Sequence, residues 1–126
     1  MTDSRSTFEV TAEPRYIARE SDPNAKRWVF AYTITIRNTG DQAARLRNRH
    51  WIVTNADGVR QEVRGRGVVG EEPYIEPDDS FRYTSAAVLE TPVGTMHGHY
   101  EFEDDDGERF LVPIPMFTLF VPNVVH

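Results

Sequence analysis

The segment with the most recognisable chemistry is Gly65-Arg66-Gly67-Val68-Val69-Gly70, which has the G-x-G-x-x-G spacing of dinucleotide-binding loops. In those proteins the loop follows a strand and opens a helix, whose N-terminus holds the pyrophosphate. Here Glu71-Glu72-Pro73 follows the last glycine. The proline opposes a helix and the two carboxylates repel a phosphate. We therefore do not expect a dinucleotide site.

The same segment supports a narrower hypothesis, an anion-binding loop. Successive backbone N–H groups of a glycine-rich loop can converge on an anion, and neighbouring arginines can supply the counter-charge. The residues of this candidate site are Arg64, Gly65, Arg66, Gly67 and Gly70. The alternative, which we favour, is that the glycines permit positive φ angles in a bulge or in a crossover between sheets.

The second candidate is a metal site at His97-Gly98-His99. Residues two apart point to the same face of a strand, so His97 and His99 can converge on Zn²⁺, Co²⁺ or Ni²⁺, with Glu101 two residues further on. A closed site needs further ligands from other strands, such as His50. The alternative, again favoured, is an exposed polar strand face on which Gly98 eases close packing.

Other charged segments are weaker candidates. The acidic residues 103–108 lack the spacing of an EF-hand, and we interpret them as a solvated hairpin tip. Arg45, Arg47 and Arg49 alternate along one predicted strand, which is typical either of an anion-binding or docking face or of a charged edge that discourages aggregation. No nucleophile–base spacing stands out. We therefore predict a protein with no catalytic residues and no cofactor.

The elements that position these residues are strands. Large apolar side chains occupy the even positions of 28–36, which indicates a strand with one buried face. We predict further strands at 8–12, 45–54, 59–63, from 81 onward, at 96–104, 108–112 and 116–121, separated by turn residues. Proline is expected to end the ladder at Pro14, and Pro113, Pro115 and Pro122 to bracket the last strand.

No window shows helical periodicity, so the predicted fold is all-β. It is an immunoglobulin-like or fibronectin type III-like β-sandwich of about seven to eight antiparallel strands, with a small closed barrel as the alternative. We expect one domain at 8–122, with a flexible N-terminal tail at 1–7 and a C-terminal tail at 123–126.

Composition narrows the functional classes. With 39% hydrophobic and 27% charged residues the chain is typical of a globular protein. It has no cysteine, and no apolar run approaches the ~20 residues of a membrane span. We see no signal peptide and expect a cytoplasmic protein.

Charge is unevenly distributed along the chain. Residues 37–66 carry a net +4 and residues 71–108 a net −11, within a total of −6. This can steer a charged partner, or it can reflect solvated strand faces, and it does not resemble the basic surface of a nucleic-acid binder.

Several segments together resemble the bacterial ApaG proteins. They are residues 30–38 (FAYTITIRN), 49–52 (RHWI), 63–71 (VRGRGVVGE), 89–100 (LETPVGTMHGHY) and 112–119 (VPIPMFTL). The similarity runs from about Phe8 to Pro122. It implies a fibronectin type III-like or immunoglobulin-like sandwich, in agreement with the strand pattern.

The resemblance implies little biochemistry. The family is linked to cobalt resistance and magnesium efflux, and related domains at the ends of eukaryotic proteins imply a binding role. We therefore expect a non-enzymatic module that binds a protein partner. The alternative is a small-ligand binder, with a nucleotide or pyrophosphate anion at Arg64–Gly70 or a divalent metal at His97 and His99.

Overall fold

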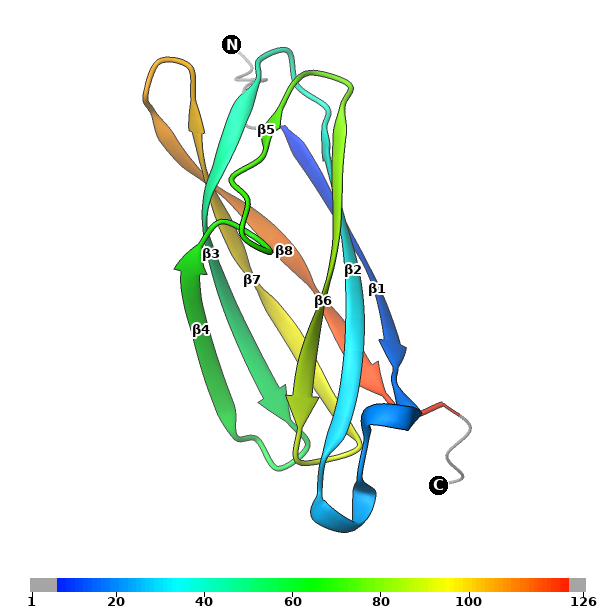
Figure 1. Cartoon of the computed structure of the whole chain (residues 1–126). Helices are drawn as coiled ribbons and strands as arrows, with labels where there is room; N and C mark the ends of the chain where they lie inside the picture. Colours follow the sequence, from blue (N-terminus) through cyan, green and yellow to red (C-terminus); the bar gives the residue numbers. More distant parts are fainter. Residues whose placement is uncertain (1–6, 123–126) are drawn as a thin grey trace.

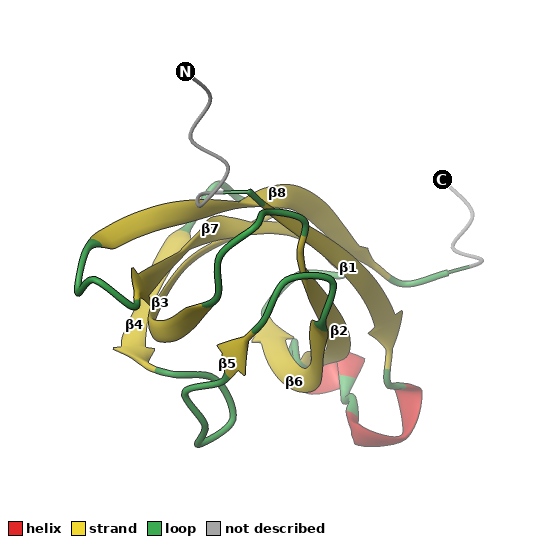
Figure 2. Ribbon diagram, turned by 90° about the horizontal axis from the view of Figure 1, so that it is seen from above, coloured by secondary structure: helices red, strands yellow, loops and turns green. Residues whose placement is uncertain are grey.

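Two antiparallel sheets pack face to face in the computed structural model, which describes residues 7–122 (Figures 1 and 2). The strands are β1 Phe8–Tyr16, β2 Trp28–Asn38, β3 Ala44–Asn55, β4 Arg60–Arg66, β5 Tyr74–Ile75, β6 Ser80–Leu89, β7 Val93–Asp104 and β8 Arg109–Phe120. One sheet has the order β1-β2-β6, and the other has the order β4-β3-β7-β8 with β5 also paired to β3. This confirms the predicted all-β sandwich of seven to eight strands.

Helical structure within residues 7–122 consists of two 3₁₀ turns between β1 and β2, η2 Ala18–Glu20 and η3 Pro23–Ala25. No helix in this part of the chain is long and apolar enough to span a membrane. The predicted tails lie outside the described residues except for Thr7, whose carbonyl accepts a 2.9 Å hydrogen bond from the Thr39 N–H.

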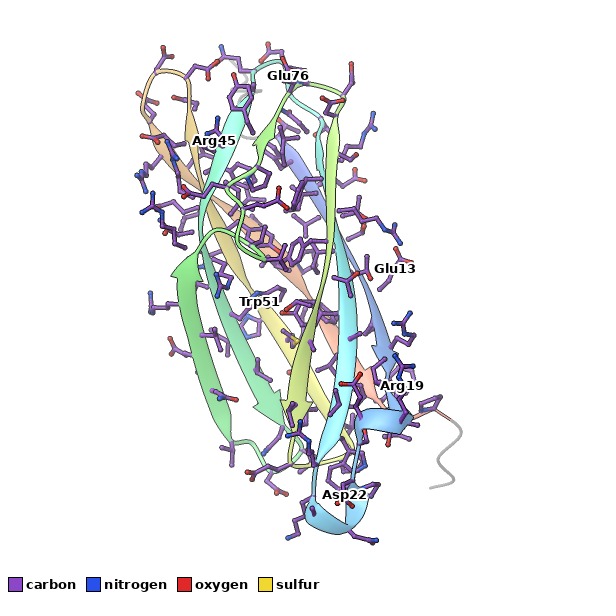
Figure 3. The ribbon with its side chains drawn as sticks, in the orientation of Figure 1. Glu13, Arg19, Asp22, Arg45, Trp51 and Glu76 are labelled. Atoms are coloured by element: carbon purple, nitrogen blue, oxygen red, sulfur yellow. The ribbon has the colours of Figure 1, made fainter. Side chains whose placement is uncertain are left out.

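The core between the sheets is centred on Trp51 of β3, whose side chain points inward from the sheet (Figure 3). Its ring makes edge-on contacts with Tyr32 at 5.4 Å, Tyr100 at 6.2 Å and Phe117 at 5.9 Å between centroids. Side chains from both sheets therefore contact one indole ring. A buried tryptophan on the third strand is typical of immunoglobulin-like sandwiches.

Pro14, Pro113 and Pro115 lie inside strands, contrary to the prediction, whereas Pro122 follows the end of β8 at Phe120 as predicted. β1 continues through Pro14, which lies opposite Tyr32, and β8 continues through Pro113, which lies opposite His99. Both strands are the terminal strands of their sheets. A proline in a terminal strand can direct its missing N–H away from the ladder, so pairing survives. The sequence pattern did not indicate which strands would lie at an edge.

A register shift in β3 changes the predicted side of one arginine. The pairing of β3 with β7 slips between Leu46 and Asn48, so that even positions are buried before the shift and odd positions after it. Arg49 therefore lies on the same side as Trp51, toward the other sheet. The expectation that Arg45, Arg47 and Arg49 share one face is wrong for Arg49.

Gly98 allows β7 to lie unusually close to β3. It is paired with Trp51 in the β3–β7 ladder, and a Cβ atom added to it would lie 1.9 Å from the backbone oxygen of His50. That overlap involves backbone at the centre of two ladders, which cannot move locally. The glycine is thus required by packing between strands and not by a turn.

Replacing Gly98 by alanine should therefore destabilise the fold strongly. We expect Gly98→Ala to lower the free energy of unfolding by at least about 3 kcal/mol, because the added methyl group must push two central strands apart. The measurement is urea denaturation followed by circular dichroism. The matched control is Gly107→Ala, at a turn with φ +82° and open space around the added Cβ, where positive φ alone should cost about 1–2 kcal/mol. Equal losses in the two variants would contradict this role of Gly98.

Candidate functional site

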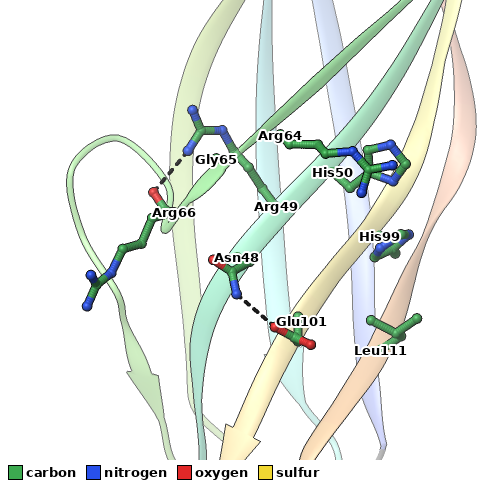
Figure 4. A pocket seen from close by; sticks show the side chains of 9 residues that line it. All are labelled: Asn48, Arg49, His50, Arg64, Gly65, Arg66, His99, Glu101 and Leu111. Carbon is green, nitrogen blue, oxygen red and sulfur yellow. Dashed lines mark hydrogen bonds between the residues drawn. The ribbon is translucent and has the colours of Figure 1, made fainter.

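An open cleft of about 500 Å³ lies over strands β3, β4, β7 and β8 (Figure 4). We call it the histidine cleft. Its lining residues are Asn48, Arg49, His50, Arg64, Gly65, Arg66, His99, Glu101 and Leu111. The adjoining residues Trp51 and Tyr100 are buried in the core. Because neighbours in a strand point to opposite faces, His50 and His99 point outward from the larger sheet.

Strand register brings the cleft residues together in two rows. In the first row Arg64 of β4 lies opposite His50 of β3, which in turn lies opposite His99 of β7. In the second row Asn48 lies between Arg66 and Glu101 in the same way. Side chains directly opposite each other across a ladder have Cβ atoms about 4.5–5.5 Å apart. Residues as far apart in sequence as Asn48 and Glu101, 53 positions, therefore share one site.

The two imidazole rings of the cleft contact each other edge to face. The ring centroids of His50 and His99 are 4.9 Å apart at an interplanar angle of 70°. Nε2 of His50 lies 2.9 Å from a carboxylate oxygen of Glu62, and since a carboxylate only accepts, this nitrogen carries the proton. The other ring nitrogen, Nδ1, is buried and has no hydrogen-bond partner among the described residues.

The cleft carries more positive than negative charge. Arg64 contacts Glu62 at 3.4 Å, a carboxylate it shares with His50, and its side chain is 72% exposed. The guanidinium of Arg49 donates to the carbonyl oxygens of Arg66 and Gly67, both at 3.0 Å. Within residues 7–122 no carboxylate forms a salt bridge with Arg49. The first row and Arg49 are therefore only partly neutralised.

Opposite charges from distant segments meet at the second row and beside it. Glu101 accepts hydrogen bonds from Asn48 at 2.7 Å and from Arg109 at 3.0 Å. Arg47 donates to Glu103 at 2.8 Å and to Glu72 at 3.0 Å. The basic and acidic stretches of the sequence thus interleave across β3 and β7.

These contacts shift the pKa values of three side chains in and beside the cleft. Burial lowers the pKa of His99, and the nearby charges of His50 and Arg64 lower it further, while Glu101 partly offsets them. The hydrogen bond from His50 lowers the pKa of Glu62. Hydrogen bonds from Asn48 and Arg109 lower the pKa of Glu101. At neutral pH the carboxylates are ionised and His99 is uncharged.

The glycine segment forms a tight turn beside the cleft. The N–H of Val68 donates to the carbonyl of Glu71 at 2.8 Å, and the N–H of Glu71 donates back at 2.9 Å. The two residues between them, Val69 and Gly70, have φ of +44° and +81°, as in a type I′ hairpin turn. Gly67 also has positive φ, and its N–H donates to the backbone carbonyl of Arg47 at 2.7 Å. The turn thus uses its glycines for backbone conformation and engages two of its amides internally.

The structure divides the residues of the predicted anion site. Arg64, Gly65 and Arg66 line the histidine cleft, whereas Gly67 and Gly70 belong to the turn outside it. Glu72, which follows the turn, accepts a 2.8 Å hydrogen bond from Arg66. Anion binding at these residues stays a prediction, and the cleft side of the segment is where an arginine remains exposed.

The predicted metal pair is divided too. His99 lines the cleft, but His97 lies opposite Ile52, two pairs further along the ladder and outside the lining. Among residues 7–122 no group of three His, Asp or Glu side chains is arranged to hold a metal ion. Metal binding at His97 and His99 stays a prediction. The residue that joins His99 is His50, considered in the sequence only as an additional ligand.

Sequence reasoning missed Asn48, Glu62 and Leu111. Glu62 had a usable signal, since Arg60, Glu62 and Arg64 alternate on one exposed face of a strand. Asn48 and Leu111 had none, because their places in the cleft follow from the register shift in β3 and from the edge position of β8.

A second hollow lies on the open side of the sandwich, between β4 and β6. We call it the edge groove. It consists of two adjoining hollows of about 310 and 420 Å³ that share Val53, Gln61 and Val88. Its floor reaches the core residues Trp51 and Met96. β4 and β6 are each the terminal strand of a sheet (Figure 1), and both contribute lining residues to this groove.

The titration of His99 gives a direct check of the cleft electrostatics. We expect its imidazole to titrate below the ordinary value of about 6.5, as measured by NMR of the ring resonances. Arg64→Gln removes a repelling charge and should raise the midpoint, whereas Glu101→Gln should lower it. Because the folded pKa lies below the unfolded one, the unfolded state binds more protons in this window, and His99 makes stability fall as pH drops below about 6.5. Shifts of the same sign in the two variants would contradict the arrangement.

Comparison with known proteins agrees with the fold and the motifs. The ApaG domain family matches residues 18–104. The protein named ApaG from Azoarcus sp. (strain BH72) is 57% identical over 119 residues, and that from Thiobacillus denitrificans is 53% identical over the same length, each alignment covering 94% of both chains. The crystal structure of an ApaA protein from Bordetella pertussis superposes with a TM-score of 0.90 at 45% identity, covering 94% of this chain and 96% of that one. This chain therefore belongs to the ApaG family.

Proposed function

We propose that this protein is a non-enzymatic binding module whose edge groove takes up an extended segment of a protein partner. The observation that carries the proposal is that two terminal strands, β4 and β6, lie on either side of a hollow whose lining includes Val63, Val88 and Met96. A terminal strand offers unpaired N–H and C=O groups to an added strand. Addition of a peptide strand to such an edge is an established mode of recognition.

The side chains of the groove favour aliphatic residues at alternate positions of the incoming segment. Val63 and Val88 stand at the rim and are 38% and 44% exposed, above buried Trp51 and Met96. A strand added beside β4 would direct every second side chain toward these residues. Its burial would remove exposed apolar surface from both proteins, which is the main driving force of association.

The outer face of β4 favours acidic residues at the remaining positions. Arg60, Arg64 and Arg66 alternate there with a single carboxylate, Glu62. Side chains of an added strand that do not enter the groove would lie beside these arginines. We therefore commit to a partner segment that alternates aliphatic with acidic residues.

The link to cobalt resistance and magnesium efflux enters this proposal as a consequence of partner binding. The arginines around His99 oppose a divalent cation at the cleft, since like charges repel in a partly buried site. A module that acts through a protein partner needs no cation site of its own. Its effect on divalent-cation handling would follow from what the partner does.

Photo-crosslinking from inside the groove tests the proposal. A photoreactive side chain at position 63 or 88 in the intact protein, expressed in its own cells, should give one discrete protein adduct. The crosslinked peptide should alternate aliphatic and acidic residues. Introducing Val63→Asp should reduce the adduct formed from position 88 at least about tenfold, because an added carboxylate opposes the acidic segment and costs about 1.4 kcal/mol or more.

The matched control position is Thr11, an exposed residue on β1, which is also a terminal strand. Gln61→Glu provides a second variant that adds negative charge without removing apolar contact, and thermal unfolding checks that both variants fold. Adducts that form equally from position 11, or that are unaffected by both charge changes, would overturn the proposal.

A further inference from the structure

The histidine cleft has the composition of a receptor for a small anion, separate from the edge groove. It combines exposed arginine, two adjacent imidazoles and a deficit of negative charge within a protein whose total charge is −6. We propose that it binds a tetrahedral dianion of the phosphate or sulfate type between Arg64, His50 and His99, with a proton taken up by His99 on binding.

The charge count favours a dianion. Arg49 points toward the inside of the sandwich, so its charge does not face an anion held between Arg64, His50 and His99 on the outer face. Arg64 lies 3.4 Å from the Glu62 carboxylate, which also contacts His50, so the charge of Arg64 is only partly offset. A proton on His99 adds a second positive charge. Together these groups match an anion of two negative charges more closely than a single carboxylate.

Glu62 occupies part of the position that such an anion needs. It lies 2.9 Å from His50 and also within salt-bridge distance of Arg60 and Arg64. Its side chain is 47% exposed, so it can turn toward solvent when a stronger acceptor arrives. A tetrahedral anion offers more acceptor oxygens than this carboxylate. Glu62 thus competes with the anion for His50 and Arg64.

The surroundings favour an anion over a cation. The charged groups that act on His99 are His50 from β3, Arg64 from β4 and Glu101 from its own strand. Glu62 of β4 contacts His50 instead. From β8, the opposite residue is the uncharged Pro113. Glu101 is itself engaged by Asn48 and Arg109. A cation would meet repulsion from Arg64, whereas an anion would relieve the repulsion between Arg64 and protonated His99.

Sulfate is the appropriate probe because its charge does not change between pH 5 and 8. In an NMR titration of the intact protein at constant ionic strength, saturable shifts should appear at His50, His99 and Arg64. Affinity should rise up to about tenfold for each unit that the pH falls through the titration of His99, since one proton is taken up. His99→Gln should remove this pH dependence.

The neighbouring charges supply variants with opposite expected signs. Arg64→Gln should weaken sulfate binding at least about tenfold, an effect of about 1.4 kcal/mol, whereas Glu62→Gln should strengthen it. The matched controls are Arg82→Gln and Glu13→Gln, which alter a similarly exposed Arg–Glu pair, 3.5 Å apart, on the smaller sheet. Figure 3 labels Glu13. Neither control should change the affinity.

Two further probes distinguish the source of the anion. Tighter binding of a short phosphoserine peptide than of inorganic phosphate would identify a modified protein as the source, and the reverse would identify a free anion. Both results support the proposal. It is overturned if no saturable shift appears at the cleft, or if the Arg82 and Glu13 variants change the response as much as the cleft variants do.

Discussion

The close approach of β3 and β7 at Gly98 is the constraint on which the rest of the structure depends. With no Cβ at this position, the two strands pair across the centre of the larger sheet. The residues on either side of the contact then face opposite ways. Trp51 enters the core and joins the two sheets, while His50 and His99 meet on the outer face. One packing contact therefore positions both the core and the candidate site.

The charges of the larger sheet are arranged by the same pairing. Arginines of β3 and acids of β7 come from segments of opposite net charge, and register places them side by side, as Arg47 and Glu103 illustrate. Ion pairs at a protein surface contribute little to stability, typically about 0–1 kcal/mol each. These pairs do determine where charge remains. Because they neutralise charged side chains of β3 and β7, the remaining positive charge lies on β4 and on Arg49. Both candidate binding features of the protein adjoin this remainder.

Arg49 lies where those two features meet. The register shift in β3 directs it toward the inside of the sandwich, and it lines both the histidine cleft and the edge groove. Its guanidinium lies against Gly65, where an added Cβ would come within 2.7 Å of it, and it donates to the carbonyls at the end of β4. A change in the position of β4 would therefore alter both the histidine cleft and the edge groove. The coupling would run through one side chain and its two hydrogen bonds.

The amino-acid sequence by itself determined the all-β class, the alternating core of 30–36 and the family, because side-chain periodicity and short motifs are local properties. It also excluded a dinucleotide loop, since Pro73 and two carboxylates follow the glycines. The tertiary structure decided which strands lie at an edge, so that Pro14 and Pro113 could stay within strands. It also decided the register, which moved Arg49 to the inner side, paired His99 with His50 instead of His97, and brought Arg64 to both. Register and edge position depend on pairing between residues far apart in the chain, and no local pattern records that pairing.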